Sequence, residues 1–276
     1  MTILLPLSVD PSREDALRLA LDTALSVGAE VRALFVVDLP GVERCEAGAP
    51  PGAIHIARQA GEEIVNRLET AGAGAVEAAG RACREAGVPF AGVVAAGDPR
   101  REIEDACAAC DLLVSGLSSR YAHDAADEAG SLVLSLMKDR VAPVLLACTP
   151  YRPVKTVVVG CGGGRRTARA VGAMAHLGLW KTGCRLVLLT AAESPAEGEA
   201  RLAVPRQALA DAGYAGWEEK VIPGPKVDAV SEFCEAERAD AVVLGGFGEH
   251  RWDDLLGRSV TGRLLAEGRA HFFLRM

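Results

Sequence analysis

The chain has 276 residues, half of them hydrophobic, which is enough to bury two cores. Its formal net charge of -7 comes from interspersed acidic and basic residues, so the concentrated basic surface that nucleic acid requires is not expected. Aromatic residues make up only 4%, which argues against a stacking platform for bases or sugars.

In the first half of the chain, short β-branched runs alternate with amphipathic or alanine-rich stretches, as in a parallel sheet covered by helices. The predicted strands are Ile3–Leu7, Val31–Val37, Phe90–Ala96, Leu112–Ser115 and Pro143–Ala147. The predicted helices are Arg13–Val27, His55–Ala86, Arg101–Cys110 and Leu132–Arg140. The segment Leu39–Ile54 is rich in Gly and Pro and is interpreted either as a lid or as a surface loop.

The second half repeats the same order of elements. Its predicted strands are Thr156–Val159, Arg185–Leu189, Glu218–Val221, Ala241–Leu244 and Phe272–Leu274. Two prolines in Thr149–Pro153 place the boundary between the halves, giving domains 1–150 and 151–276. The predicted fold class is α/β, with two tandem Rossmann-like domains, each a five-stranded parallel sheet flanked by helices.

Local matches between the halves support this duplication. Ala95–Pro99 and Val221–Pro225 each close a third strand with a Gly and a Pro. Cys110–Gly116 and Ala239–Gly245 are each a buried strand that ends on Gly. Ligands bind outside the carboxyl ends of strands in open parallel sheets, and Gly there permits a close approach of backbone to ligand.

On these motifs the chain resembles the universal stress protein family, in its tandem two-domain form, over nearly its whole length. The resemblance implies an adenine nucleotide alpha-hydrolase-like fold. A domain of that family has a Gly-x-x-Gly turn, nine residues, and Gly-Ser/Thr at the start of its last helix, and nucleotide-binding members hold ATP with these loops. Small residues expose backbone N–H groups, and a helix N-terminus favours phosphate.

The second domain keeps most of this pattern. Gly245–Gly248 matches the turn and nine residues follow, but Arg258 then stands in place of Gly, either contacting phosphate or blocking the pocket. The glycine-rich run Gly160–Gly164 is interpreted as an anion-binding loop or as a permissive loop before a helix. The implied nucleotide-binding residues are Gly160, Gly162, Leu244, Gly245, Gly248, Arg258, Ser259 and Val260.

The first domain departs further from the family. Ser119 replaces the second Gly of the turn, and the Asp expected after the first strand is Ser8, with Asp10 as a neighbouring substitute. In the second domain the same position is Gly162, so both acidic contacts are missing. The degenerate first site comprises Pro6, Ser8, Val36, Gly97, Gly116, Ser119, Gly130 and Ser131.

Metal and catalytic motifs are weak. Cys107 and Cys110 have metal-like spacing without a second Cys or His pair, so no metal is expected beyond Mg bound with a nucleotide. No nucleophile elbow or P-loop is present, so the protein is predicted not to be an enzyme, with weak ATP hydrolysis left open. Scattered cysteines and the lack of a long apolar run indicate a soluble, cytoplasmic protein without a membrane partner.

Two functional interpretations stay open. The first is a stress-response or regulatory protein that binds ATP or another adenine nucleotide, mainly in domain 2. The second is a nucleotide-independent interaction module, or a sensor of another small ligand, with degenerate ATP sites. The resemblance also implies an internal pseudo-dimer of the two domains and a homodimer of chains.

Overall fold

The computed structural model describes residues 1–48, 50, 52–117, 119, 121, 142–223, 226–245, 264–265 and 267–275. The chain divides into two compact units, Met1–Ala142 and Pro143–Met276. The sequence instead predicts a boundary at residue 150. The difference concerns the strand Val144–Ala147, which hydrogen-bonds to the last strand of the second unit.

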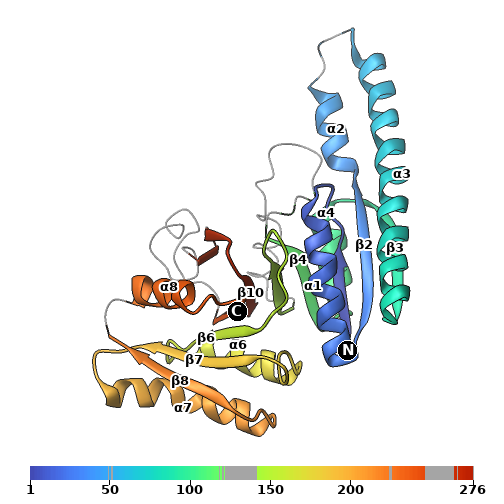
Figure 1. The fold of residues 1–276 in the computed structure, drawn as a ribbon. Helices are drawn as coiled ribbons and strands as arrows, with labels where there is room; N and C mark the ends of the chain where they lie inside the picture. The colour runs from blue at the N-terminus through green and yellow to red at the C-terminus, as the bar shows by residue number, and fades with distance from the viewer. Residues whose placement is uncertain are drawn as a thin grey trace. The chain divides into compact units, whose positions relative to one another are not determined.

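The first unit has four described strands, all parallel, in the order β3-β2-β1-β4. These strands are β1 (Thr2–Pro6), β2 (Glu30–Asp38), β3 (Phe90–Gly97) and β4 (Leu112–Gly116). The helices are α1 (Ser12–Val27), α2 (Leu39–Ala47), α3 (Ile54–Ala86) and α4 (Pro99–Cys107). Figure 1 shows α1 and α3 beside β2, and α2 leading directly on from the end of that strand.

Helix α2 corrects the interpretation of Leu39–Ile54 as an irregular segment. The Asp38 carboxylate accepts a hydrogen bond of 2.9 Å from the Gly41 N–H, and Pro40 stands in the first turn, where its missing N–H costs nothing. Val42 is buried, and α2 packs against α3. A capped start and a buried face therefore make nine of these residues helical despite their Gly and Pro content.

The described part of the second unit has five parallel strands in the order β10-β9-β6-β7-β8. These are β6 (Thr156–Gly160), β7 (Arg185–Ala191), β8 (Trp217–Ile222), β9 (Ala241–Gly245) and β10 (His271–Arg275). A sixth strand, β5 (Val144–Ala147), runs antiparallel to β10. The described helices are α6 (Arg165–His176), α7 (Pro195–Asp211) and α8 (Lys226–Ala236).

The predicted fold class is confirmed, because both units are mostly parallel sheets flanked by helices. The second unit has the five parallel strands expected of it. The predicted fifth strand of the first domain, Pro143–Ala147, instead groups with the second unit and pairs antiparallel. The predicted helix Leu132–Arg140 lies outside the described residues. None of the described helices combines the length and the apolar character that crossing a membrane requires.

The outermost strand of the first unit, β3, and that of the second unit, β8, differ in charge. β3, with the sequence Phe-Ala-Gly-Val-Val-Ala-Ala-Gly, carries no charged side chain, and Val93 is 55% exposed. β8 carries Glu218 and Glu219, which form ion pairs with Arg185 and Arg206. The edge strand of the second unit thus carries charged side chains, whereas the edge strand of the first unit is apolar.

Candidate functional site

In the first unit, side chains of the protein itself fill the space at the carboxyl end of β4. The hydroxyls of Ser12, at the start of α1, and Ser119, in the loop after β4, lie 2.8 Å apart and are buried. A Cβ on Gly116 would lie 2.5 Å from the Ser119 Oγ and 2.7 Å from the Ser12 Oγ. The structure therefore brings the predicted residues Gly116 and Ser119 together, but hydroxyl groups fill the space between them.

A buried tyrosine also packs at this end of β4. The Tyr121 hydroxyl lies 2.6 Å from the Oγ of Ser115 in β4, and burial raises the pKa of Tyr121 to about 12. The phenol therefore stays protonated in the folded protein at neutral pH. Sequence reasoning missed both Ser12 and Tyr121. The signal available for Ser12 was its place after Pro11 at a helix start, whereas Tyr121 had none.

Ser8 occupies the position at which the family resemblance implies an aspartate, so no carboxylate is present there. The Ser8 side chain is buried, and its hydroxyl donates to the backbone oxygen of Asp10 over 3.4 Å. The Asp10 carboxylate accepts a hydrogen bond of 2.9 Å from the Ser12 N–H, so it is engaged at the start of α1. Asp10 thus stabilises a helix end, as short polar side chains commonly do.

The other described members of the first predicted site lie on three strands. Pro6 ends β1, and Val36 is buried in the neighbouring strand β2. Gly97 ends β3, the outer strand, and β2 separates it from β1. Gly97 therefore does not meet Gly116, which lies on the opposite side of β1.

In the second unit, the described predicted residues do come together. Gly160 ends β6, and a Cβ there would lie 2.8 Å from the Leu244 Cδ2 on the adjacent strand β9. The Gly162 N–H donates to the Thr167 Oγ1 over 3.2 Å. A Cβ on Gly245 would lie 2.6 Å from the backbone nitrogen of Thr167. Thr167, in the first turn of α6, thus connects the glycine loop to the end of β9.

The start of helix α6 has an electropositive character. Its N-cap residue, Gly164, makes no side-chain capping bond, and its first turn contains no acidic residue. Arg165 and Arg166 occupy that turn, are exposed, and form no ion pair with any residue that the structure describes. Cations at a helix N-terminus oppose the helix dipole, so this end is suited to an anion.

A buried hydroxyl without a partner lies on the strand beside this loop. The Thr190 Oγ1, near the carboxyl end of β7, has no hydrogen-bond partner among the described residues, and the side chain is 1% exposed. β7 pairs with β6, and the Cys161 N–H donates to the Leu189 oxygen over 2.7 Å. A buried hydroxyl without a hydrogen bond, such as that of Thr190, is rare in folded proteins because its desolvation costs free energy.

Several predicted residues lie outside the described part of the chain. They are Gly130, Ser131, Gly248, Arg258, Ser259 and Val260. The second glycine of the predicted turn, Gly248, and the implied contacts at Arg258, Ser259 and Val260 therefore stay predictions.

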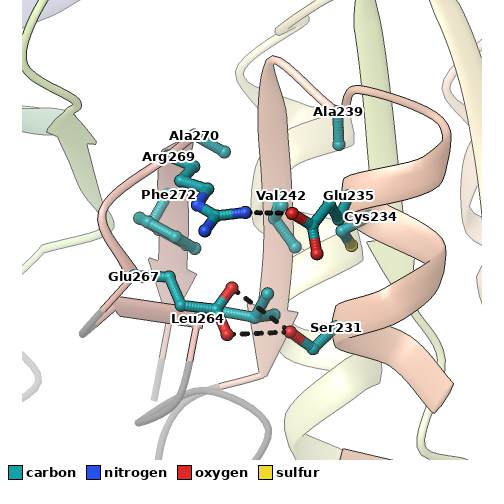
Figure 2. Close-up of a pocket in the computed structure, with 10 residues that line it drawn as sticks. All are labelled: Ser231, Cys234, Glu235, Ala239, Val242, Leu264, Glu267, Arg269, Ala270 and Phe272. Atoms are coloured by element: carbon teal, nitrogen blue, oxygen red, sulfur yellow. Dashed lines mark hydrogen bonds and ion pairs between the residues drawn. The ribbon is translucent and has the colours of Figure 1, made fainter. Parts of the chain in front are cut away.

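A small hollow lies between α8 and the strands β9 and β10 (Figure 2). Its volume is about 30 Å³, enough for about one water molecule. Figure 2 shows the Glu267 carboxylate facing the Ser231 hydroxyl, at 3.1 and 3.2 Å, and Arg269 paired with Glu235. Burial raises the pKa of Cys234 to about 12, so its thiol stays protonated. The hollow is too small for a nucleotide.

Cys107, Cys110 and His271 have the surroundings of structural residues rather than of metal ligands. Burial raises the pKa of Cys107 to about 12 and also raises that of Cys110, so neither favours the thiolate that a metal needs. The fully buried His271 accepts a hydrogen bond of 3.1 Å from the Cys148 N–H at Nδ1. Among the described residues, no three His, Cys, Asp or Glu side chains gather to hold a metal.

Comparisons with known proteins give a family match over part of the chain and a likeness of fold. Residues 1–131 match the model of the Universal stress protein family. A universal stress protein from Archaeoglobus fulgidus DSM 4304 is 19% identical, and the match covers 99% of this chain and 95% of that chain with a TM-score of 0.67. A putative universal stress protein from Pseudomonas aeruginosa UCBPP-PA14 is 15% identical over 99% and 92%, with a TM-score of 0.57. At these identities the likeness shows the fold alone.

A third structure was solved with a ligand. It is a universal stress protein in complex with cAMP, 25% identical, and the match covers 45% of this chain and 98% of that chain with a TM-score of 0.40. No curated protein matches the chain significantly.

Proposed function

Because residues 1–131 match the model of the Universal stress protein family, we propose that the chain is a member of that family and a non-enzymatic stress-response or regulatory protein. Its second unit binds ATP or a related adenine nucleotide. Such a ligand would lie at the carboxyl end of β6, with its phosphates against the first turn of α6.

The observation that carries this proposal is the positive charge at the start of α6, which has no ion-pair partner in the part of the chain that the structure describes. Arg165 and Arg166 follow a glycine loop, in a turn that has neither a capping side chain nor an acidic residue. The backbone N–H groups of that turn and the two guanidinium groups are all donors, and phosphate oxygens accept from both kinds. The buried Thr190 hydroxyl supplies a further donor on the adjacent strand.

The first unit does not fit a nucleotide in the same way. The Ser12 and Ser119 hydroxyls occupy the space above Gly116, and Tyr121 is hydrogen-bonded to Ser115 beside it. We therefore assign binding to the second unit and expect one nucleotide per chain.

The test is a calorimetric titration of the full chain with ATP, ADP and cAMP. Loss of a guanidinium that contacts phosphate costs about 1.5 to 3 kcal/mol, so Arg166→Gln is expected to weaken ATP binding at least tenfold. Arg169→Gln is the matched control, since Arg169 is also exposed on α6 but follows the first turn. Equal ATP affinity of both variants, or no ATP binding at millimolar concentration, would overturn the proposal.

The non-enzymatic part has its own measurement. Labelled ATP incubated with the wild-type chain and with Arg166→Gln should be converted at the same background rate. Faster turnover by the wild type alone would indicate an ATPase.

A second candidate is a nucleotide-independent module or a sensor of another small ligand. The closed Ser12–Ser119 contact favours it, together with the missing carboxylates at Ser8 and Gly162. The same titration separates the two candidates, because this one predicts no heat of binding with any adenine nucleotide.

A further inference from the structure

A cavity lined by none of the predicted nucleotide-binding residues lies in the first unit, between α1, β2 and α3. Its volume is about 250 Å³. Its lining residues are Val9, Arg13, Phe35, Ile64, Arg67, Leu68 and Ala71. Figure 1 shows the three elements side by side, with α1 and α3 next to β2. Four lining residues share one face of α3, since their spacing of three or four residues matches the helical turn.

The walls of this cavity are apolar. Phe35 is 1% exposed and forms the base, while Ile64 and Leu68 are half-buried on α3. Val9, just after β1, is 44% exposed, so an apolar side chain at the opening is in contact with water. A ligand with a hydrocarbon body would remove this surface from water, which is favourable by about 25 cal/mol per Å².

Two guanidinium groups provide the polar contacts. Arg13 is half-buried in the first turn of α1, and Arg67 is exposed on α3. Neither forms an ion pair or side-chain hydrogen bond with any residue that the structure describes, and no acidic side chain is among the described residues that line the cavity. Guanidinium forks hold carboxylates through paired hydrogen bonds.

We infer that this cavity binds a small amphipathic carboxylate, with the acid group between Arg13 and Arg67 and its hydrocarbon body against Phe35, Ile64 and Leu68. The volume lies below the 300 to 1,000 Å³ usual for drug-sized ligands, which favours a short aliphatic chain. The walls offer no side-chain acceptor that could read a base, so an adenine nucleotide is not the expected occupant. The inference is independent of the function proposed for the second unit.

The experiment is an NMR titration of the ¹⁵N-labelled full chain with octanoate, and with octanamide as the uncharged analogue. Octanoate should cause saturable shifts of the amides of the lining residues, and octanamide should bind at least tenfold more weakly. Arg13→Gln and Arg67→Gln should each weaken octanoate binding at least fivefold. Arg58→Gln serves as the control, because Arg58 is exposed on α3 and does not line the cavity.

A variant that keeps both charges tests the apolar part. Ala71 lines the cavity and is exposed, so Ala71→Leu should occupy space without displacing the core and should weaken octanoate binding. Thermal unfolding of each variant shows that the fold is retained. The inference is overturned if octanoate gives no saturable shifts in the millimolar range, if octanamide binds equally well, or if Arg58→Gln has the same effect as Arg13→Gln. Arg166→Gln should leave octanoate binding unchanged, so the two proposals fail separately.

Discussion

At the residue scale, small hydroxyl groups decide what the end of the first sheet can hold. Ser12 and Ser119 contact each other above Gly116, and Tyr121 contacts Ser115 in the same region. Each of these polar atoms is buried, and each has a hydrogen-bond partner within the protein. A site that binds phosphate needs donors that face the ligand instead of one another.

The phenol of Tyr121 should make stability depend on alkaline pH. Its pKa is raised from 10.0 to about 12, so its contribution is fully present below pH 10 and is lost as the pH rises toward 12. At about pH 11, the free energy of unfolding should have fallen about 1 kcal/mol more in the wild type than in Tyr121→Phe. Urea unfolding followed by circular dichroism at pH 8 and pH 11 measures this difference.

Other buried groups cancel in this comparison. Burial also raises the pKa of Tyr214, but that residue is present in both proteins. At pH 8, Tyr121→Phe should be less stable by about 1 kcal/mol, the value of the lost hydrogen bond to Ser115. The same alkaline loss in both proteins would show that Tyr121 is not the responsible group.

At the scale of single elements, helix α3 contains glycines with opposite surroundings. A Cβ on Gly72 would lie 2.5 Å from the Phe35 ring, so the missing side chain allows the helix to pack on β2. A Cβ on Gly74 would meet nothing within 4 Å. The two residues thus have the same helical backbone but different neighbours.

The pair gives a matched test of this packing. Gly74→Ala should stabilise the protein by about 0.5 to 1 kcal/mol, because alanine favours the helix and reduces the entropy of the unfolded chain. Gly72→Ala should destabilise it by about 1 to 3 kcal/mol, because the methyl group displaces the buried Phe35 ring. Thermal unfolding measures the stability of both variants. A Gly72→Ala variant more stable than Gly74→Ala would contradict the packing of α3 on Phe35.

Strands and helices with a strong hydrophobic pattern were predictable from the sequence. Contacts between separate elements were not. The predicted strands Phe90–Ala96 and Ala241–Leu244 each end one residue short of the observed strands, since apolar runs that end on glycine leave few alternatives. Helix α2 was missed because its stability comes from the Asp38 cap and from packing on α3. Arg13 and Arg67 are 54 positions apart, and only the fold brings them to one cavity.

At the scale of the whole molecule, the position of β5 decides where the second unit begins. Leu145 and Leu146 are buried, and β5 pairs with β10 over three residues. The Cys148 N–H also donates to His271 in β10. A boundary at residue 150, as the prolines predict, would separate all of these contacts from the second unit.

Two fragments of the chain test whether the second unit begins at residue 143 or after residue 150. The fragment 143–276 should be more stable than 151–276 by at least about 3 kcal/mol, because it retains two buried leucines worth about 1.5 to 3 kcal/mol each. Urea unfolding followed by tryptophan fluorescence suits both fragments, since all three tryptophans lie in the second unit. Equal midpoints would favour the boundary at residue 150. Leu145→Ala in the longer fragment is the control, with an expected loss of about 2 to 5 kcal/mol.

The uncharged outer strand β3 has a practical consequence for handling the protein. A flat apolar edge is a template onto which strands of other molecules can add, and salt does not screen this attraction. When the protein is warmed or concentrated, precipitation should therefore begin from the first unit and persist at high ionic strength. A single lysine in place of Val93 should raise the concentration at which the solution stays clear, as charges on edge strands do in natural sheets.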